Sequence, residues 1–335
     1  MAILGPNNTE NSPKLDSSPK MLGILLGILY GIAIRLVWDL EELEGIGELV
    51  TISFMFLVPF VIGFIRVYFE EKANTSLTVV KMLILPWLPI FIFLLTTLFT
   101  LLEGSICVIM AAPAFLFCAS LGGLTAGLLS RAFKNKGTLS CVAILPLVVA
   151  PLELNYLESS RTYEVINQIE IDSSPEVIWS QLGNIEQIEK HEIPSSLTTL
   201  IGIPTPISAQ MSGLQVGSVR TSRWEKGIVF KEVITEWSVN KRMAYDFDID
   251  PDVIPDDSLD KHVKLGGEYF SPLSGKYEIT SSDQEGKSIL SLSTIVRDDT
   301  NFGIYSRVWG QLIFSDFHTS LLGLIKNRAE NISSN

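Results

Sequence analysis

The sequence has little cysteine, with only Cys107, Cys118 and Cys141 in 335 residues. All three lie in apolar runs, and none lies after residue 152. This distribution excludes a disulfide framework and a cysteine-based metal site in the more polar second half of the chain.

Basic residues are scarce in the second half. Residues 153–335 carry 16 Lys and Arg against 27 Asp and Glu, which accounts for nearly all of the net charge of −12. An acidic domain without a basic stripe lacks the attraction to phosphate on which nucleic-acid binding depends. We therefore expect no nucleic-acid partner, and docking to an anionic membrane surface would need apolar contacts.

Common catalytic and metal-binding motifs are also missing. There is no nucleophile elbow, phosphate-binding loop or cysteine–histidine constellation, and His191, His262 and His318 lie far apart. Seven aspartates fall between Asp246 and Asp260; a solvated strand face and an acidic loop explain them, with a cation site as the alternative. We predict no catalytic residue, no metal site and no cofactor, and His318 is the best candidate for acid–base chemistry.

Long apolar runs fill the first half, and the mean hydropathy of the chain is +0.33. Five segments have the composition of membrane spans, although the last is short. They are Met21–Trp38, Val50–Phe69, Met82–Leu102, Ser105–Ala132 and Thr138–Leu152. We predict a polar tail over residues 1–20, which is retained as part of an anchor, and an α-helical membrane bundle of five spans over residues 21–152.

The loops between these segments alternate in basic charge. The N-terminal tail, the second loop and the fourth loop carry Lys or Arg, whereas the first loop, DLEELEGIGE, and the third, around Glu103, carry none. Basic residues concentrate on the cytoplasmic side of membranes. The pattern predicts an integral protein of the plasma membrane with a cytoplasmic N-terminus and the C-terminal domain outside. If the short fifth segment does not cross, the domain lies on the cytoplasmic side.

Small residues and one charge mark the first apolar segment. Gly23, Gly27 and Gly31 recur every four residues, so they share one helix face on which another backbone can approach closely. Packing within the bundle is the leading interpretation, and a homodimer through these glycines is the alternative. Arg35 lies near the predicted outer end, where we expect its side chain to reach the interface.

The second half has the pattern of an α+β domain. A strand near Val165–Ile171 leads through a capping turn at Asp172–Glu176 into an amphipathic helix, and a second short helix is expected over Ile185–Glu192. A long apolar helix is expected over Ile304–Arg328. Turn signals between them separate six further strands, near Ser218–Trp224, Ile228–Val239, Met243–Ile249, Val263–Phe270, Gly275–Ser281 and Ser288–Val296. An antiparallel sheet must then curl around the terminal helix.

Three stretches carry a resemblance to a known superfamily: Ile169–Gln187, which contains PEVIWSQLGNIEQ, Val233–Phe247 (VITEWSVNKRMAYDF) and Tyr305–Asn327 (YSRVWGQLIFSDFHTSLLGLIKN). Over residues 160–330 the chain resembles the START-like helix-grip superfamily, which includes polyketide cyclase/dehydrase-like and lipid-transfer domains. The resemblance implies a cavity between sheet and long helix that holds an apolar ligand. It does not imply an enzyme, because function depends on the site and not on the fold. The N-terminal helices lie outside this resemblance.

The expected ligand-binding residues lie on the terminal helix and the central strands. Tyr305, Trp309, Leu312 and Asp316 share one helix face, which core packing would also explain for Leu312 and Trp309. On the strands we expect Tyr245, Phe247 and Tyr269 to face the ligand.

These patterns predict a membrane-tethered protein that binds or transfers a hydrophobic small molecule or lipid. The alternatives are a cyclase-type enzyme acting on an apolar substrate and a sensor or assembly module. An all-apolar cavity would favour the carrier, and a pair of catalytic groups facing the cavity would favour the enzyme.

Overall fold

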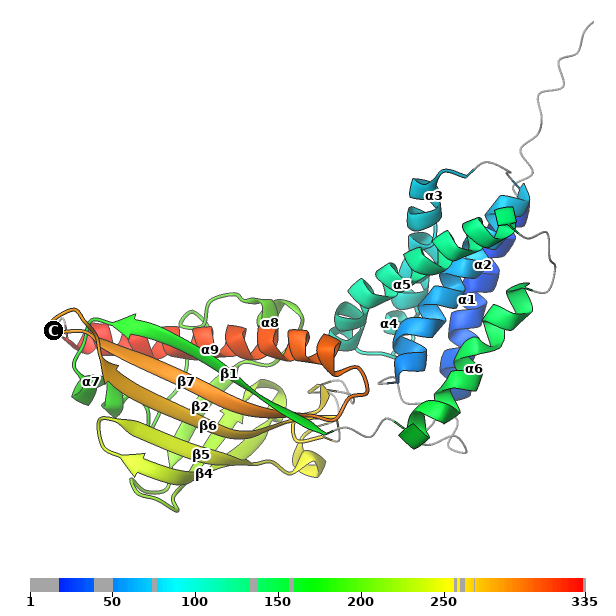
Figure 1. Cartoon of the computed structure of the whole chain (residues 1–335). Coiled ribbons are helices and arrows are strands. Elements are labelled where there is room, and N and C mark those ends of the chain that lie inside the picture. Colours follow the sequence, from blue (N-terminus) through cyan, green and yellow to red (C-terminus); the bar gives the residue numbers. More distant parts are fainter. Residues whose placement is uncertain are drawn as a thin grey trace, which may run out of the picture.

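The computed structural model describes residues 18–38, 51–73, 77–132, 138–156, 160–255, 258–259, 263–267 and 269–333. It has two parts: an apolar helical bundle, and a sheet domain that meets one end of the bundle (Figure 1). The bundle contains α1 (Ser18–Trp38), η2 (Ser53–Leu57), α2 (Val58–Ala73), α3 (Val79–Ile84), α4 (Trp87–Phe99), α5 (Ser105–Ala132) and α6 (Thr138–Tyr156).

Four apolar stretches of the described residues are long enough to cross a membrane, namely Pro19–Val37, Ser53–Ala73, Val79–Phe99 and Ser105–Ala132. The fifth predicted span coincides with a shorter apolar helix over Leu139–Leu152. The prediction of apolar helices is therefore confirmed, and the number of membrane spans stays a prediction. Pro86 separates α3 from α4, because proline lacks the amide hydrogen that a continuous helix needs.

Two glycines allow α2 and α5 to cross in backbone contact. A Cβ atom on Gly63 would lie 2.0 Å from the Ala119 carbonyl oxygen, and one on Gly122 would lie 1.9 Å from that of Phe60. Neither distance is compatible with a side chain, so the helices approach closely only because both positions are glycine.

The glycine stripe on α1 is already occupied within the chain. A Cβ atom on Gly23 would lie 2.8 Å from the Phe69 Cβ, and one on Gly31 would lie 2.9 Å from both Ile62 and Phe93. Gly27 likewise faces Ile62. The stripe therefore packs on α2 and α4 inside the bundle, and the alternative of a homodimer through these glycines is not supported.

Arg35 is paired within the chain. Its side chain is 3% exposed, and its Nε lies 2.6 Å from Glu103 Oε1. It also donates a hydrogen bond to the Leu102 carbonyl at 3.3 Å. The sequence did not indicate this partner, because the carboxylate that pairs with Arg35 lies 68 residues further along the chain. That Arg35 reaches the membrane interface stays a prediction.

The sheet domain begins with β1 (Arg161–Ile171) and ends with the 31-residue α9 (Gly303–Ser333). Between them lie α7 (Pro175–Ser180), α8 (Leu197–Leu200), β2 (Pro206–Met211), β3 (Val219–Trp224), η3 (Glu225–Gly227), β4 (Val229–Ser238), β5 (Arg242–Asp248), η4 (Pro251–Val253), β6 (Phe270–Ser281) and β7 (Ser288–Asp298). Within the described residues the strands form one antiparallel sheet in the order β1-β7-β6-β5-β4-β3-β2.

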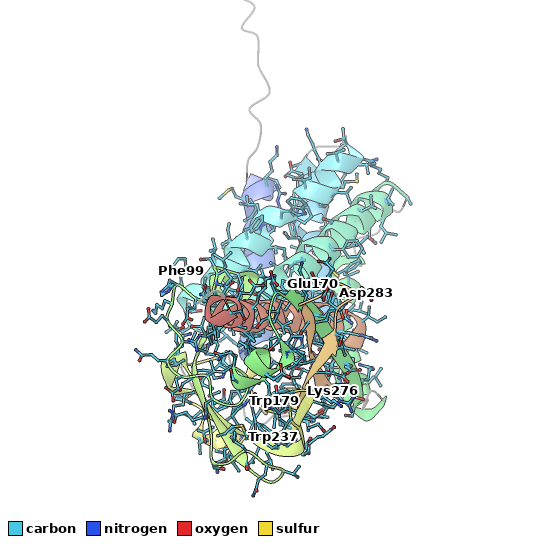
Figure 2. The ribbon with its side chains drawn as sticks, turned by 90° about the vertical axis from the view of Figure 1, so that its left-hand side faces the viewer. Phe99, Glu170, Trp179, Trp237, Lys276 and Asp283 are labelled. Carbon is cyan, nitrogen blue, oxygen red and sulfur yellow. The ribbon has the colours of Figure 1, made fainter. Side chains whose placement is uncertain are left out.

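This sheet curls around α9, and the two bury a common core (Figure 1). Tyr277 and Leu290 of the sheet pack with Leu322 and Ile325 of the helix. A curled antiparallel sheet that grips a long C-terminal helix is the helix-grip arrangement, which confirms the α+β prediction for the second half. Figure 2 shows Trp179 of α7 beside Trp237 of β4, whose rings meet edge-to-face at 4.9 Å between centroids.

Three local expectations are wrong. Residues 263–267 form a helical turn and a loop where a strand was expected, and β6 begins only at Phe270. Pro272 lies inside β6 at a bulge, where a turn was expected, because a bulge tolerates a residue without an amide hydrogen. Ile185 pairs with Ala209 in an extended bridge and does not begin a helix.

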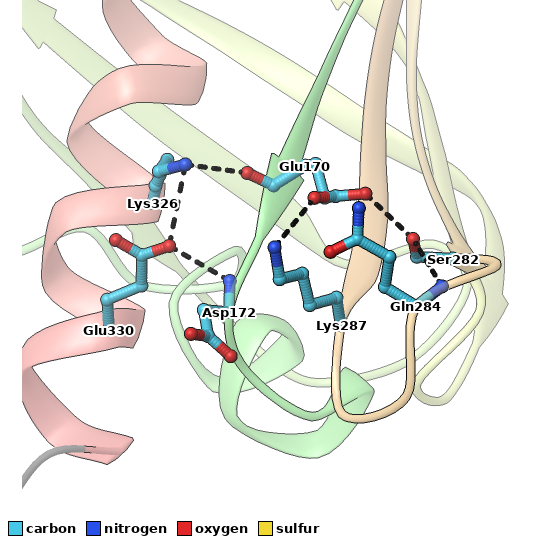
Figure 3. Close-up of polar contacts among 7 residues, drawn as sticks. All are labelled: Glu170, Asp172, Ser282, Gln284, Lys287, Lys326 and Glu330. Carbon is cyan, nitrogen blue, oxygen red and sulfur yellow. Dashed lines mark hydrogen bonds and ion pairs between the residues drawn. The ribbon is translucent and has the colours of Figure 1, made fainter.

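Polar contacts fasten the C-terminal half of α9 to the sheet (Figure 3). The Lys326 ammonium donates to the Glu170 carbonyl at 2.8 Å, and Glu330 accepts from the Asp172 amide at 2.9 Å. The Glu170 carboxylate accepts from Ser282 at 2.7 Å and from Lys287 at 3.1 Å. The Ser282 and Lys287 hydrogen bonds lower the pKa of Glu170. These contacts close the end of the domain that lies away from the bundle.

Candidate functional site

A cavity of about 280 Å³ lies between the sheet and α9 and extends onto the helical bundle. Aromatic and aliphatic side chains dominate its wall, including Phe230, Phe247 and Leu292 from the strands and Phe317 and Leu321 from α9. Strand alternation explains the wall, because every second residue of a curled sheet points to the concave side. Largely apolar concave sites of this kind hold small apolar ligands.

A buried ion pair interrupts the apolar wall. Arg220 of β3 and Glu232 of β4 stand directly opposite each other in the antiparallel pairing, and the Arg220 Nε donates to the Glu232 carboxylate. A second guanidinium nitrogen donates to the Leu182 carbonyl at 2.8 Å. Both side chains line the cavity and are almost completely buried. The cavity therefore has a polar group that could orient one end of a ligand.

Two tyrosine rings support this pair. The Arg220 guanidinium lies 4.9 Å from the ring centre of Tyr245 and 5.7 Å from that of Tyr277. Burial opposes the charge of Arg220, but attraction by Glu232 and both tyrosines outweighs it and raises the pKa of the guanidinium. Burial raises the pKa of Glu232, and attraction by Arg220 offsets part of that rise.

His318 of α9 forms a second, neutral polar group in the cavity wall. Its Nε2 lies 2.8 Å from the Thr294 hydroxyl, and its Nδ1 lies 3.0 Å from the Asn167 side-chain oxygen. Burial lowers the pKa of His318 to about 4. A neutral imidazole that donates to Asn167 and accepts from Thr294 satisfies both contacts, so the ring is held in place and uncharged near neutral pH.

Five of the seven expected ligand-binding residues line the cavity. They are Tyr245, Phe247, Tyr269, Tyr305 and Trp309. A ligand-binding role for each of them stays a prediction.

Leu312 and Asp316 do not line it. Leu312 is 48% exposed, and Asp316 accepts hydrogen bonds from the Thr198 amide at 2.8 Å and the Thr198 hydroxyl at 2.6 Å. Burial would raise the pKa of Asp316, but the Thr198 hydrogen bonds outweigh it and lower that pKa. Asp316 therefore holds the short helix α8 against α9.

The helix face was misplaced by about one residue, which is a rotation of about 100°. Beyond Trp309 the cavity is lined by Gly310, Ile313, Phe314, Phe317, His318 and Leu321. The sequence could not fix this rotation, because α9 is apolar on more than one face.

Sequence analysis missed Arg220 and Glu232. A signal was present in β4, where Phe230, Glu232 and Ile234 share the inward face and a charge stands among apolar positions. It could also have been found by pairing β3 with β4. Among the described residues no cluster of His, Cys, Asp or Glu could hold a metal ion. Asp256, Asp257, Asp260 and His262 lie outside the described residues.

Comparison with known proteins gives likenesses in structure but none in sequence. No family model and no curated protein matches the chain. Norcoclaurine synthase from Thalictrum flavum is 14% identical over 52% of this chain and 98% of its own, with a TM-score of 0.34. Zhui aromatase/cyclase from Streptomyces sp. R1128 is 9% identical over 52% of this chain and 96% of its own, also at 0.34. XoxI from Bacillus cereus is 15% identical over 51% of this chain and 97% of its own, with a TM-score of 0.31. Values this low carry no functional argument, and the assignment of the helix-grip arrangement rests on the sheet order and α9.

Proposed function

We propose that this protein is a membrane-tethered binding or transfer protein for a hydrophobic small molecule or lipid. The observation that carries the proposal is the cavity of about 280 Å³ between the sheet and α9, with its largely apolar and aromatic wall. A solid core would be packed without such a space. Arg220 and Glu232 give the cavity one polar end, which suits an amphipathic ligand better than a pure hydrocarbon.

The charge of the bundle supports tethering with the sheet domain outside the cytoplasm. Lys72 and Arg131 lie in the last turns of α2 and α5, which end away from the sheet domain (Figure 1). Arg131 lies 3.3 Å from Glu71 there. Lys20 lies 3.4 Å from Glu70 in the same region. Basic residues at that end favour its placement in the cytoplasm. Five crossings, with α6 as the last, would then bring the sheet domain to the opposite side.

The test is to identify what the full-length protein carries. Protein extracted in mild detergent would be analysed by mass spectrometry for bound apolar molecules, in the wild type and in two variants of α9. Leu321→Trp fills the cavity, whereas Leu312→Trp makes the same change on an exposed position of the same helix. We expect the wild type and Leu312→Trp to retain a bound molecule and Leu321→Trp to lose it.

Stability gives an independent readout for the same variants. A cavity accepts the indole of Leu321→Trp with little loss, whereas overpacking a tight core costs about 1–3 kcal/mol. A destabilised Leu321→Trp variant, together with no bound molecule in the wild type, would overturn the proposal.

A further inference from the structure

The cavity wall is not made by the sheet domain alone. Near the start of α9 it continues onto the helical bundle, through residues of three elements. These are Phe54 and Met55 of η2, Phe93 and Leu94 of α4, and Val108 and Met110 of α5. The site described above therefore extends onto the apolar helices and is incomplete without them. The part of the cavity that these bundle residues line is called the opening below.

Direct contacts join the two halves beside this opening. The Tyr305 hydroxyl donates to the Met110 carbonyl of α5. Phe56 packs edge-on against Phe302 and Tyr305, at 6.1 and 6.4 Å between ring centres. A further contact joins α5 to the residue that follows α8: the Ser105 hydroxyl lies 3.5 Å from the Ile201 carbonyl. The first turn of α9 thus belongs to the cavity and to the junction at once.

The Glu103 carboxylate at the opening is neutralised. Glu103 lines the cavity, is 8% exposed and pairs with Arg35 at 2.6 Å. A buried carboxylate without a partner would retain water and oppose the passage of an apolar chain. Pairing with Arg35 removes most of that barrier. The role of the Arg35 charge in α1 is therefore to neutralise Glu103.

Large apolar side chains are exposed on elements that meet where the two halves join. Ile304 and Val308 project from α9 one turn apart and are 89% and 52% exposed. Phe99 and Leu101, at the end of α4 and just after it, are 81% and 88% exposed, and Figure 2 shows Phe99 at the level where bundle and sheet domain meet. Such exposure is costly in water and favourable in lipid. The apolar bundle ends at the same level, so lipid is the medium that fits these side chains.

We infer that the helical half forms the entrance of the binding site, through which a membrane-dissolved molecule with one slender apolar chain passes between η2, α4 and α5 into the cavity. This inference rests on the proposed function and adds a route and a ligand class. The volume of about 280 Å³ lies at the lower end of ligand sites, which favours one chain over two. The bundle then loads the domain directly from the bilayer.

The experiment uses the full chain reconstituted in phosphatidylcholine vesicles that contain a long-chain alcohol with a diazirine in its chain. After loading, the protein is extracted, purified away from the vesicles and irradiated, so that only bound probe reacts. Labelled peptides are then mapped. We expect label on β4 and β5 and also on the first turns of α5, which face the same cavity.

Val108→Trp narrows the opening, and Ile109→Trp makes the matched change on the neighbouring exposed residue that does not line it. Met55→Trp narrows the opening from η2 as a second block. We expect both narrowing variants to lose at least tenfold of the label on β4 and β5 while Ile109→Trp keeps it. A second arm delivers the same alcohol from cyclodextrin to protein in detergent and measures occupancy without a bilayer.

The outcomes separate the two proposals. Label on the strands alone, or unchanged loading in both narrowing variants, overturns the entrance and leaves the binding function standing. No label on the strands of the wild type in either arm overturns the binding function itself. If a narrowing variant fails to fold, the distribution of label in the wild type still tests whether the bundle forms the entrance.

Discussion

At the scale of single residues, the site depends on charges that have been taken out of water. Arg220 and Glu232 face each other across β3 and β4, and Arg35 and Glu103 meet at the opening of the cavity. Each pair is stable only because both partners are present, since the desolvation cost of one buried ion is several kcal/mol. The effect of removing one partner is therefore larger than the net contribution of the pair.

We predict that Glu232→Ala lowers the free energy of unfolding by about 3–5 kcal/mol, because Arg220 is left buried without its carboxylate. The double replacement Arg220→Met with Glu232→Leu should be nearly neutral, since it removes both charges and keeps the volume apolar. Denaturant unfolding of the full chain in micelles, followed by tryptophan fluorescence, measures both. Equal destabilisation by the single and double replacements would contradict the assignment of a buried pair.

The imidazole of His318 makes stability depend on pH. Burial lowers its pKa from 6.5 to about 4 in the folded protein, so between these values the unfolded chain binds more protons and stability falls as pH falls. At about 1.4 kcal/mol per unit of pKa, we predict a loss of up to about 3 kcal/mol between pH 6.5 and pH 4.

Unfolding measured over that range tests the effect of His318. His318→Gln should abolish the loss of stability that His318 causes between pH 6.5 and pH 4. His191→Gln, at an exposed position, should leave that loss unchanged. An identical pH profile in the wild type and His318→Gln would show that other groups cause the loss.

At the scale of elements, long helices could be read from the sequence, and the strand boundaries only in part. Hydropathy is summed over a whole apolar run, so local errors cancel, and every predicted span falls on a helix. The strand expected over 263–270 failed because a short run of alternating residues occurs equally in a loop. The strand β2 was missed because prolines such as Pro204 and Pro206 are more typical of a loop than of a strand interior. Contacts between distant segments, such as Arg35 with Glu103, leave no local pattern.

The crossing of α2 and α5 gives a prediction at this scale. Gly63→Ala should destabilise the bundle by about 1–3 kcal/mol, because the added methyl meets the backbone of Ala119 and the helices must separate. Gly323→Ala in α9 is the matched control, because no atom lies within 4 Å of the position of its added Cβ. We expect this change to raise the free energy of unfolding by about 0.5–1 kcal/mol. Thermal unfolding in micelles compares them, and a neutral Gly63→Ala would rule out the close crossing.

At the scale of the whole molecule, the two halves share one cavity although they differ in composition. Apolar runs predicted the bundle, and alternation predicted the sheet. Neither could predict that α9 begins against α5, because the contact of Tyr305 with Met110 joins residues 195 positions apart. The sequence therefore predicted only part of the candidate site. The cavity lining from the sheet domain could be predicted, and the lining from the helical bundle could not.

The side of the membrane on which the domain lies is open to direct measurement. In a chain with Cys107, Cys118 and Cys141 replaced by serine, we predict that Glu285→Cys in the β6–β7 hairpin reacts with an impermeant maleimide in intact cells. Ala73→Cys, at the end of α2 remote from the sheet domain, should react only after permeabilisation. Equal reaction of both in intact cells would contradict five crossings.

The attachment of α9 to α5 has a consequence for how any cargo could move. A soluble carrier ferries its cargo by diffusing as a whole, but here the sheet domain follows α6 in the chain and is also held to α5 through Tyr305. A domain attached to the bundle at both places would not leave it, so under the proposed function the cargo would have to move independently of the protein. The protein would remain in place, and delivery of the cargo would require a separate, mobile acceptor that binds to it.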